Sequence, residues 1–385
     1  MSKNQSSSSQ EYWTYPDVAK TLEIALYYGF TPSKTFTLEK SDRDCGKHFD
    51  CLGASFIKPE EKAALIRYWA NNNQALAPMM LATSKPEQHK DPTFEYNLEV
   101  IGTNRSIADA TLIKATYEIA KAEGYSNIVL ELNTVGDRES FARYTRELTN
   151  YFRKHMSEIH PECRQAIKKN IYDGLLCEHA ECKDIIDRTP HPMNYLSEPS
   201  RSYFTELLEL LEMSDIPYSI NDTLIANYEC AMHTIFRISG NNGDKNEVIA
   251  FGTRWGVIAK KMGYKKDIQG MSATIVVKQL DKKNKPAKIK KPQLYFIQMG
   301  NEAKLKSLRV IEVLRQSKIP VYHSLTKDKL TAQLISAENL KVPYILILGQ
   351  KESMENTIVV REMRNRSQET IRLEQVPDYL KKVLG

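Results

Sequence analysis

Apolar residues recur with two different periods along the first 280 residues of the chain. Helical spacing predicts helices from Pro16 to Gly29, from Pro59 onward, over 107–122, after Asp137 and over about 200–213. Short β-prone runs predict strands at 94–102, where alternation has period two, and at 127–133, 216–220, 230–238, 247–252 and 271–280. Because the strands come in pairs and the helices are segregated from them, the pattern predicts an α+β body around an antiparallel sheet.

A different pattern begins near residue 293. Strands at 294–298, 320–322, 343–348, 356–361 and 369–373 alternate with helices at 301–316, 327–340 and 377–384. This spacing predicts a three-layer α/β domain over 293–385 with a largely parallel sheet. Around it we expect a Ser-rich disordered tail at 1–10, the body over 11–280, a helical insertion within it at 156–190 and a Lys-rich linker at 281–292.

Composition excludes several classes of protein. With 41% hydrophobic and 26% charged residues, the chain can bury an ordinary globular core. No apolar run approaches the roughly 20 residues that a membrane helix needs, and the first ten residues lack the apolar core of a signal peptide. Six cysteines in a chain of 385 residues are no disulfide framework, so we expect a soluble cytoplasmic protein without a membrane partner.

The net charge of +6 is modest, but its lysines are concentrated between the two units. A solvated linker explains such a run, and contact with nucleic-acid phosphates is compatible with the same residues. The residues expected to face RNA lie in this run and in the C-terminal domain, and a solvated lysine surface remains the alternative for them. They are Lys282, Lys283, Lys285, Lys288, Lys290, Lys291, Lys327 and Lys329.

Known chemical motifs are scarce. The sequence contains no P-loop, no GxGxxG fingerprint and no Gly-x-Ser-x-Gly elbow. Two clusters, Cys45/His48/Cys51 and Cys177/His179/Cys182, each place three soft ligands close together, whereas a structural zinc site needs four. Cys163 or His160 completes the second cluster only if the insertion folds back on itself. The sequence therefore predicts no metal site, with these cysteines as buried or surface thiols.

The order of several segments resembles histidyl-tRNA synthetase, a class II aminoacyl-tRNA synthetase. Residues 55–69 stand where the family has its Arg-Pro-Glu-Gly-Thr segment. The other matching segments are 98–102, 108–110, 130–137, 195–204, 216–218 and 300–384. The resemblance implies a class II antiparallel sheet with helices, a C-terminal anticodon-binding-like α/β domain, a homodimer and tRNA as a partner.

The residues that the family uses for catalysis are largely replaced. Class II enzymes clamp the ATP triphosphate with arginines and Mg²⁺, which a lysine or an apolar residue does not reproduce. The motif 2 arginine falls near Leu81, the motif 3 Glu-Arg pair falls on Lys278-Gln279, and the catalytic arginine of the histidine segment falls on Ala226. Other substrate contacts fall on Lys62, Glu95, Cys230 and Ala231. Retained positions are Glu60, Glu99, Gly252 and Arg254.

These replacements predict a degenerate ligand pocket, with Glu60, Glu99, Glu95 and Arg254 as its remnants and Ala226, Gln279 and Leu81 as its lost positions. Purely structural roles, in the first turn of a helix, at a polar position of a strand or in a buried ion pair, would equally explain why these residues are present. We therefore expect a non-catalytic paralogue that binds tRNA or related RNA in a regulatory or accessory role and needs no cofactor. An active histidine–tRNA ligase using ATP and Mg²⁺, and a protein-partner regulatory subunit on the same fold, remain alternatives.

Overall fold

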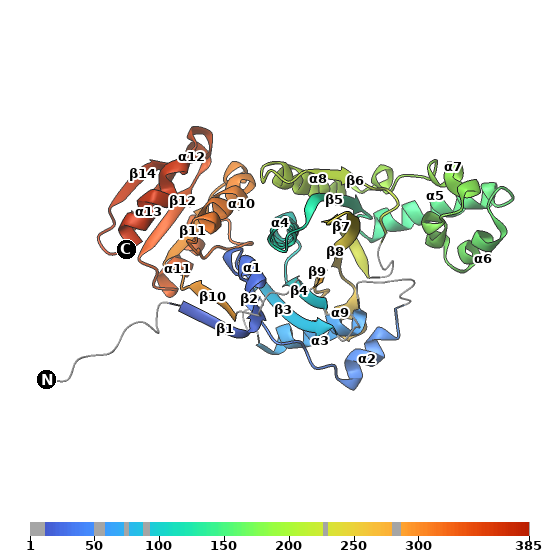
Figure 1. Cartoon of the computed structure of the whole chain (residues 1–385), viewed down its shortest axis with the longest axis horizontal. Coiled ribbons are helices and arrows are strands. Elements are labelled where there is room, and N and C mark those ends of the chain that lie inside the picture. The colour runs from blue at the N-terminus through green and yellow to red at the C-terminus, as the bar shows by residue number, and fades with distance from the viewer. Residues whose placement is uncertain are drawn as a thin grey trace.

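The computed structural model describes residues 12–49, 58–72, 77–87, 93–225, 230–278 and 286–384. Its body is built on an eight-stranded sheet in the spatial order β2-β3-β4-β9-β8-β7-β5-β6 (Figure 1). The strands are β2 (Thr31–Pro32), β3 (Met79–Glu87), β4 (Thr93–Ile101), β5 (Ser126–Thr134), β6 (Tyr218–Ile220), β7 (Ala231–Asn242), β8 (Lys245–Trp255) and β9 (Gly270–Lys278). All neighbours pair antiparallel except the outer pairs β2–β3 and β5–β6. The expected α+β body with an antiparallel sheet is confirmed.

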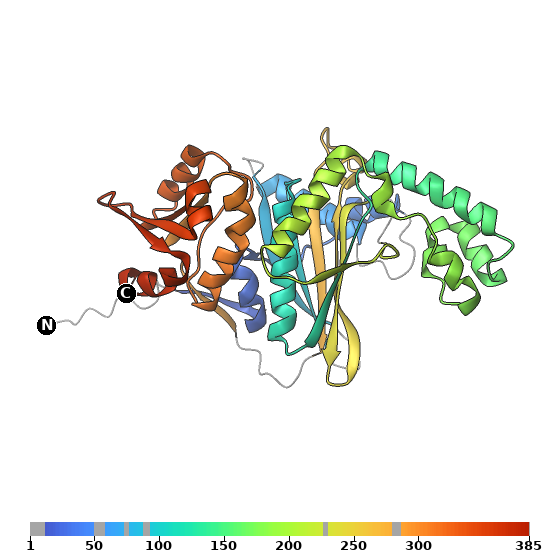
Figure 2. The same ribbon diagram turned by 90° about the horizontal axis from the view of Figure 1, so that it is seen from above.

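Helices cover both faces of this sheet. Because successive side chains of a strand point to opposite faces, Leu81 and Ala82 of β3 lie in two different hydrophobic clusters. Ala82 packs with α4 (Ser106–Ala122) and α8 (Glu198–Glu212), which run together along one face in Figure 2. Leu81 packs with α3 (Pro59–Asn72) and α9 (Ile258–Lys261) on the other face. A third helix, α2 (Lys40–Gly46), packs against α3.

The start of the chain differs from the prediction. Instead of a helix from Pro16, residues Tyr12–Ala19 form β1, followed by a 3-10 turn (Lys20–Leu22) and the short helix α1 (Glu23–Tyr27). Strand β1 pairs antiparallel with β10 (Pro286–Lys290), so part of the expected linker is also a strand. Local spacing missed both strands because each is completed only by a partner from the other end of the body.

The insertion at 156–190 is helical, as expected, and has a core of its own. Helix α5 (Arg138–His155), capped by the Asp137 side chain, leads to it. Its elements are α6 (Pro161–Lys169), α7 (Lys183–Ile186) and the 3-10 turns η2 (Ile171–Leu176) and η3 (Ala180–Cys182), before a further turn η4 (Pro192–Tyr195) returns to the body. Figure 1 shows the insertion and the C-terminal domain at opposite ends of the molecule.

The C-terminal domain contains a four-stranded sheet in the order β11-β12-β13-β14. Its strands are β11 (Leu294–Gln298), β12 (Tyr344–Leu348), β13 (Thr357–Glu362) and β14 (Gln368–Arg372), and its helices are α10 (Asn301–Gln316), α11 (Leu330–Asn339), α12 (Gln350–Glu355) and α13 (Val376–Leu384), with a 3-10 turn (Leu373–Gln375) before α13. The expected largely parallel sheet is only partly confirmed: Tyr322 of the predicted strand at 320–322 joins β11 in parallel through an isolated bridge, but half of the sheet is antiparallel. Among the four strands of the sheet only β11 and β12 pair in parallel, because the connections from β12 onward are too short for a crossover.

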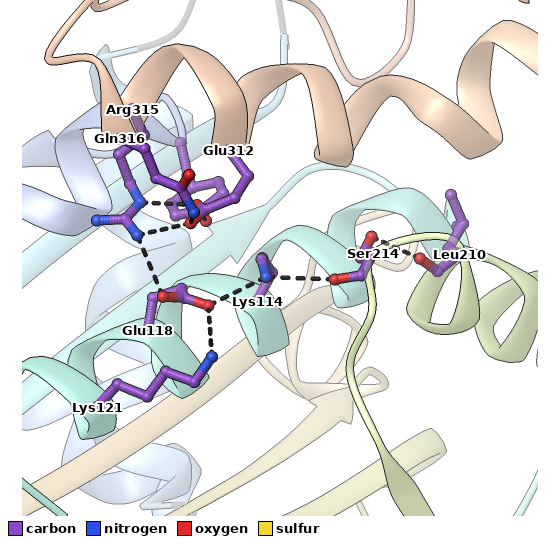
Figure 3. A network of polar contacts seen from close by, with 9 residues as sticks. Lys114, Glu118, Lys121, Leu210, Ser214, Glu312, Arg315 and Gln316 are labelled. Atoms are coloured by element: carbon purple, nitrogen blue, oxygen red, sulfur yellow. Dashed lines mark hydrogen bonds and ion pairs between the residues drawn. The ribbon is translucent and has the colours of Figure 1, made fainter. Parts of the chain in front are cut away.

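A polar network joins the two units where α10 meets α4 (Figure 3). Arg315 of α10 donates to Glu118 of α4 at 3.1 Å and also to Glu312 on its own helix at 2.7 Å. Lys114 donates to the same Glu118 at 3.0 Å, and the hydroxyl of Tyr28, the residue that follows α1, donates to Glu312. Apolar residues of both units continue around this network as one core, so the domain is docked rather than tethered. Within the described residues, no helix combines the length and apolarity that crossing a bilayer requires.

Candidate functional site

The candidate ligand pocket lies on the α3 face of the sheet. Lys62 of α3 extends to the central strand β4, where its Nζ lies 2.5 Å from Oε1 of Glu99. Ser272 of β9, the cross-strand neighbour of Glu99, donates to the other carboxylate oxygen and accepts from the indole of Trp255 at 2.6 Å. The Lys62 and Glu99 side chains are only 4% and 7% exposed. Glu99, a position that the resemblance marks as retained, and Lys62, one that it marks as replaced, therefore form an ion pair with each other.

Burial raises the pKa of the Glu99 carboxyl above its ordinary value, and the hydrogen bonds from Lys62 and Ser272 act against that rise. A buried carboxylate is tolerated only when an opposite charge and hydrogen bonds replace its water. Lys62 supplies that charge from within the chain. A ligand ammonium would have to displace a tethered ammonium from the same carboxylate, which makes this a closed ion pair rather than an open binding site.

Arg254 does not take part in this pocket. It lies on β8 one residue before Trp255, so its side chain projects to the opposite face of the sheet, toward α4. There it is fully buried, contacts Asp109 at 2.5 Å and donates to the carbonyl of Thr103 at 2.8 Å. Tyr203 donates to the same Asp109 at 2.7 Å. This predicted remnant therefore anchors the start of α4 to the sheet.

The other predicted residues lie around the pair or have partners of their own. Leu81 is buried directly across from Glu99 on β3, where an arginine side chain was expected from the resemblance. Glu95 is buried and accepts from Asn97 at 2.6 Å. Glu60 is half-buried in the first turn of α3 and packs against the α2 end at Gly46. Sequence reasoning identified Lys62 and Glu99 separately, but not their contact.

Several predictions fall on residues that the structure does not describe. Ala226 and Gln279, the lost positions of the histidine segment and of motif 3, lie outside the described residues. The same holds for Lys282, Lys283 and Lys285. These expectations stay predictions.

The described lysines do not form a single surface. Lys290 and Lys291 line a pocket of about 160 Å³ between the β10 end and the C-terminal domain. Two further exposed lysines line the same pocket and were missed by sequence reasoning: Lys318, which follows α10, and Lys381 on α13. They are distant along the chain, so no charge run reveals them. We call these four residues the lysine pocket.

The remaining predicted lysines lie elsewhere. Lys288 places its Nζ over the ring of the exposed Tyr12, 4.4 Å from the centroid, where β10 pairs with β1. Lys327 and Lys329 are exposed before α11, and Lys327 donates to Ser336. Lys288, Lys327 and Lys329 all lie outside the lysine pocket.

The two Cys/His clusters differ in outcome. Cys45 is buried in α2, His48 is exposed after it, and Cys51 lies outside the described residues. In the insertion, the chain does fold back, and Cys163 lies beside Cys177 and His179.

The chain is similar to an anticodon-binding domain and to histidine–tRNA ligases. The model named Anticodon binding domain matches residues 293–383. A histidine–tRNA ligase of Dehalococcoides mccartyi is 27% identical over 292 residues, which cover 75% of this chain and 70% of that protein. A histidine–tRNA ligase of Ruthia magnifica is 24% identical over 389 residues, covering 93% and 92%. Apo histidyl-tRNA synthetase from S. aureus has the same fold, with a TM-score of 0.50, 20% identity and 93% of each chain covered.

The alignment with the Ruthia magnifica protein covers nearly all of both chains. The chain is therefore similar to histidine–tRNA ligases over more than nine tenths of its length, and its residues 293–383 match the anticodon-binding domain.

Proposed function

We propose that this chain is a non-catalytic member of the histidyl-tRNA synthetase family that binds tRNA or related RNA in a regulatory or accessory role. The observation that carries the proposal is the buried Lys62–Glu99 pair. Making an aminoacyl-adenylate requires an open cavity for the amino acid and cations directed at the triphosphate. Here Lys62 neutralises the Glu99 carboxylate from within the chain, the resemblance places the motif 2 arginine position near Leu81, and Arg254 is bound to Asp109 on the other face.

RNA binding is supported by the C-terminal domain and by the end of β10 beside it. Its matched family model is described as an anticodon-binding domain. The lysine pocket gathers four cations from three separate segments beside that domain. Lysines act as point charges for phosphates and release counterions when they bind, which makes the affinity salt-dependent. Tyr12 beside Lys288 adds an exposed aromatic ring on which a base can stack.

Catalysis is tested by histidine-dependent exchange of pyrophosphate into ATP in the presence of Mg²⁺. We expect no exchange above the level without histidine, and no charging of tRNA. Measurable exchange would overturn the non-catalytic proposal and restore the active-ligase alternative, with ATP and Mg²⁺ as its cofactors.

RNA binding is tested by measuring tRNA affinity over a salt series. The variant replaces the lysine pocket with alanine at Lys290, Lys291, Lys318 and Lys381. The matched control removes the same charge from exposed lysines elsewhere, at Lys168, Lys169, Lys265 and Lys266. Each lost phosphate contact reduces the slope of log affinity against log salt by about 0.7–0.9.

We expect a smaller slope only in the first variant. Equal slopes in both variants would remove the lysine pocket from the proposal. Absence of tRNA binding by the unaltered chain would exclude RNA as the partner and leave a protein partner, as in the regulatory-subunit alternative. The proposed assembly is a homodimer, for which light scattering must give twice the mass of the chain.

A further inference from the structure

The insertion gathers three cysteines and two histidines from separate turns into one place. Cys163 lies in α6, Cys177 directly follows η2, and Cys182 ends η3. Their three sulfur atoms lie within 4.8 Å of one another. None of the five described cysteines of the chain is in a disulfide. Three thiols brought together without a disulfide need a reason that packing of a small core does not supply.

An imidazole completes the set. His179 Nδ1 lies 3.3 Å from Cys163 Sγ and 3.6 Å from Cys177 Sγ. In a tetrahedral zinc site with bonds of about 2.3 Å to sulfur and about 2.0–2.1 Å to nitrogen, neighbouring ligand atoms lie about 3.5–3.8 Å apart. The contact of His179 with Cys177 lies within that range, and its contact with Cys163 is about 0.2 Å shorter. The Cys163–Cys177 distance of 2.7 Å needs the two sulfurs to move apart by about 1 Å to reach it.

We propose that the insertion binds one structural Zn²⁺ through three thiolates and one imidazole, supplied by Cys163, Cys177, Cys182 and His179. On binding, the three thiol protons pass to solvent, and the metal forms three bonds to sulfur and one to His179 Nδ1. Thiolate and imidazole ligands in this number select zinc over the oxygen-preferring Mg²⁺ and Ca²⁺. The sequence alone predicted no metal here because the rest of α6 and the whole of η2 separate Cys163 from Cys177 along the chain.

The surroundings support these ligands. The other ring nitrogen of His179 lies 3.6 Å from a carboxylate oxygen of Glu162, the arrangement in which an outer carboxylate orients a metal-bound imidazole. The backbone N–H of His160 donates to Cys182 Sγ at 3.3 Å. The His160 ring stacks on His179 at 4.0 Å, and its Nδ1 is buried without a hydrogen-bond partner in the described structure. We assign His160 to positioning, since only His179 contacts two of the sulfurs.

A metal would also solve a stability problem of the insertion. Its regular elements are one nine-residue helix, one four-residue helix and two 3-10 turns. Units of this size rarely fold on a hydrophobic core alone and are commonly held by disulfides or metals. Zinc at this cluster would join α6 to Cys177 after η2 and Cys182 at the end of η3, in addition to the apolar packing around Phe152 and Ile167.

The first test measures zinc in the full-length protein, purified under reducing conditions with zinc supplied and then desalted. We expect about one zinc per chain by elemental analysis. Replacement by Co²⁺ should give the intense visible bands of a tetrahedral site and a sulfur-to-metal charge-transfer band. Zinc well below stoichiometry, or a cobalt spectrum of an octahedral site, would overturn the proposal.

The second test uses matched variants. Cys163→Ser, Cys182→Ser and His179→Ala should each lower zinc affinity at least about tenfold. Cys45→Ala, a buried cysteine outside the insertion, and His160→Ala, which keeps the backbone donor, should retain zinc. Loss in His160→Ala with retention in His179→Ala would overturn the assignment of His179.

The third test separates zinc from a disulfide and does not depend on folded variants. The unaltered chain, denatured with a chelator and without reductant, should titrate all six cysteines of its sequence as thiols. Two missing thiols, mapped to Cys163 and Cys177, would show a disulfide in their place and refute the metal site.

Discussion

Replacing Lys62 by methionine tests the closed ion pair directly. The change removes the ammonium but keeps most of the apolar stem, so Glu99 is left buried with only Ser272 as its described partner. Removing one partner of a buried pair typically costs about 3–5 kcal/mol. The carboxyl can escape by taking up a proton, which limits the cost. Protonating a carboxyl with an ordinary pKa of 4.5 at pH 7.5 costs about 4 kcal/mol, at 1.36 kcal/mol for each of the three pH units. The loss of stability through Glu99 therefore stays below about that value.

The same reasoning fixes the pH dependence. Without Lys62 the folded pKa of Glu99 stands above its unfolded value, so the cost is absent below pH 4.5 and grows as pH rises. We expect Lys62→Met to lose about 3–4 kcal/mol at pH 7.5 and about 1–1.5 kcal/mol at pH 5.5. The double variant Lys62→Met with Glu99→Gln should recover most of the loss, because no charge remains buried.

Urea unfolding followed by tryptophan fluorescence measures these losses, since Trp69 and Trp255 belong to the hydrophobic cluster around the pair. The matched control is Lys58→Met, whose ammonium is half-exposed and pairs with Glu61 at 3.4 Å. It should change stability by less than about 0.5 kcal/mol. A loss below about 1 kcal/mol for Lys62→Met at pH 7.5, or an equal loss at both pH values, would refute the reasoning.

Three further predictions concern other buried charges. Arg254→Met should cost at least about 3 kcal/mol in thermal or urea unfolding, because Asp109 stays buried without its cation, and adding Asp109→Asn should relieve part of that loss. Arg315→Met should loosen the docking of the C-terminal domain and speed proteolysis between the units, whereas Arg309→Met on the exposed side of α10 should leave the cleavage rate unchanged. Burial lowers the pKa of His233 to about 4. Stability should therefore fall as the pH drops from 6.5 to 4, because over this range the unfolded histidine binds a proton and the folded one does not. His233→Asn should flatten this decline in a pH series of urea midpoints, and an unchanged decline would contradict the prediction.

Elements with a strong local pattern could be predicted from the sequence. Helix α4 and strand β4 lie where the apolar periodicity placed them, since each buries a face that its own residues define. The errors share one cause. Strands β1 and β10 exist only through each other, and the parallel or antiparallel pairing of β12 depends on how the chain returns to it. Local periodicity contains no information about a partner that is distant in sequence.

The candidate sites divide in the same way. The resemblance identified Glu99 as a retained position and Lys62 as a replacement, which indicated a changed pocket. Their contact follows from α3 packing over β4, a tertiary fact that neither residue type reveals. Likewise the spacing of Cys177 and Cys182 was visible, whereas the approach of Cys163 depends on the path of the whole insertion.

The pairing of β1 with β10 has a consequence for how the chain is made. Tyr12 is paired with Lys290, 278 residues further along the chain, so β1 has no partner strand until the ribosome has also synthesised β10. Contacts of such long sequence separation slow folding and leave an unpaired strand edge exposed in the meantime. Truncation just before residue 286 would leave β1 in that state permanently, so a recombinant body that ends there should aggregate, whereas one extended past residue 290 should not.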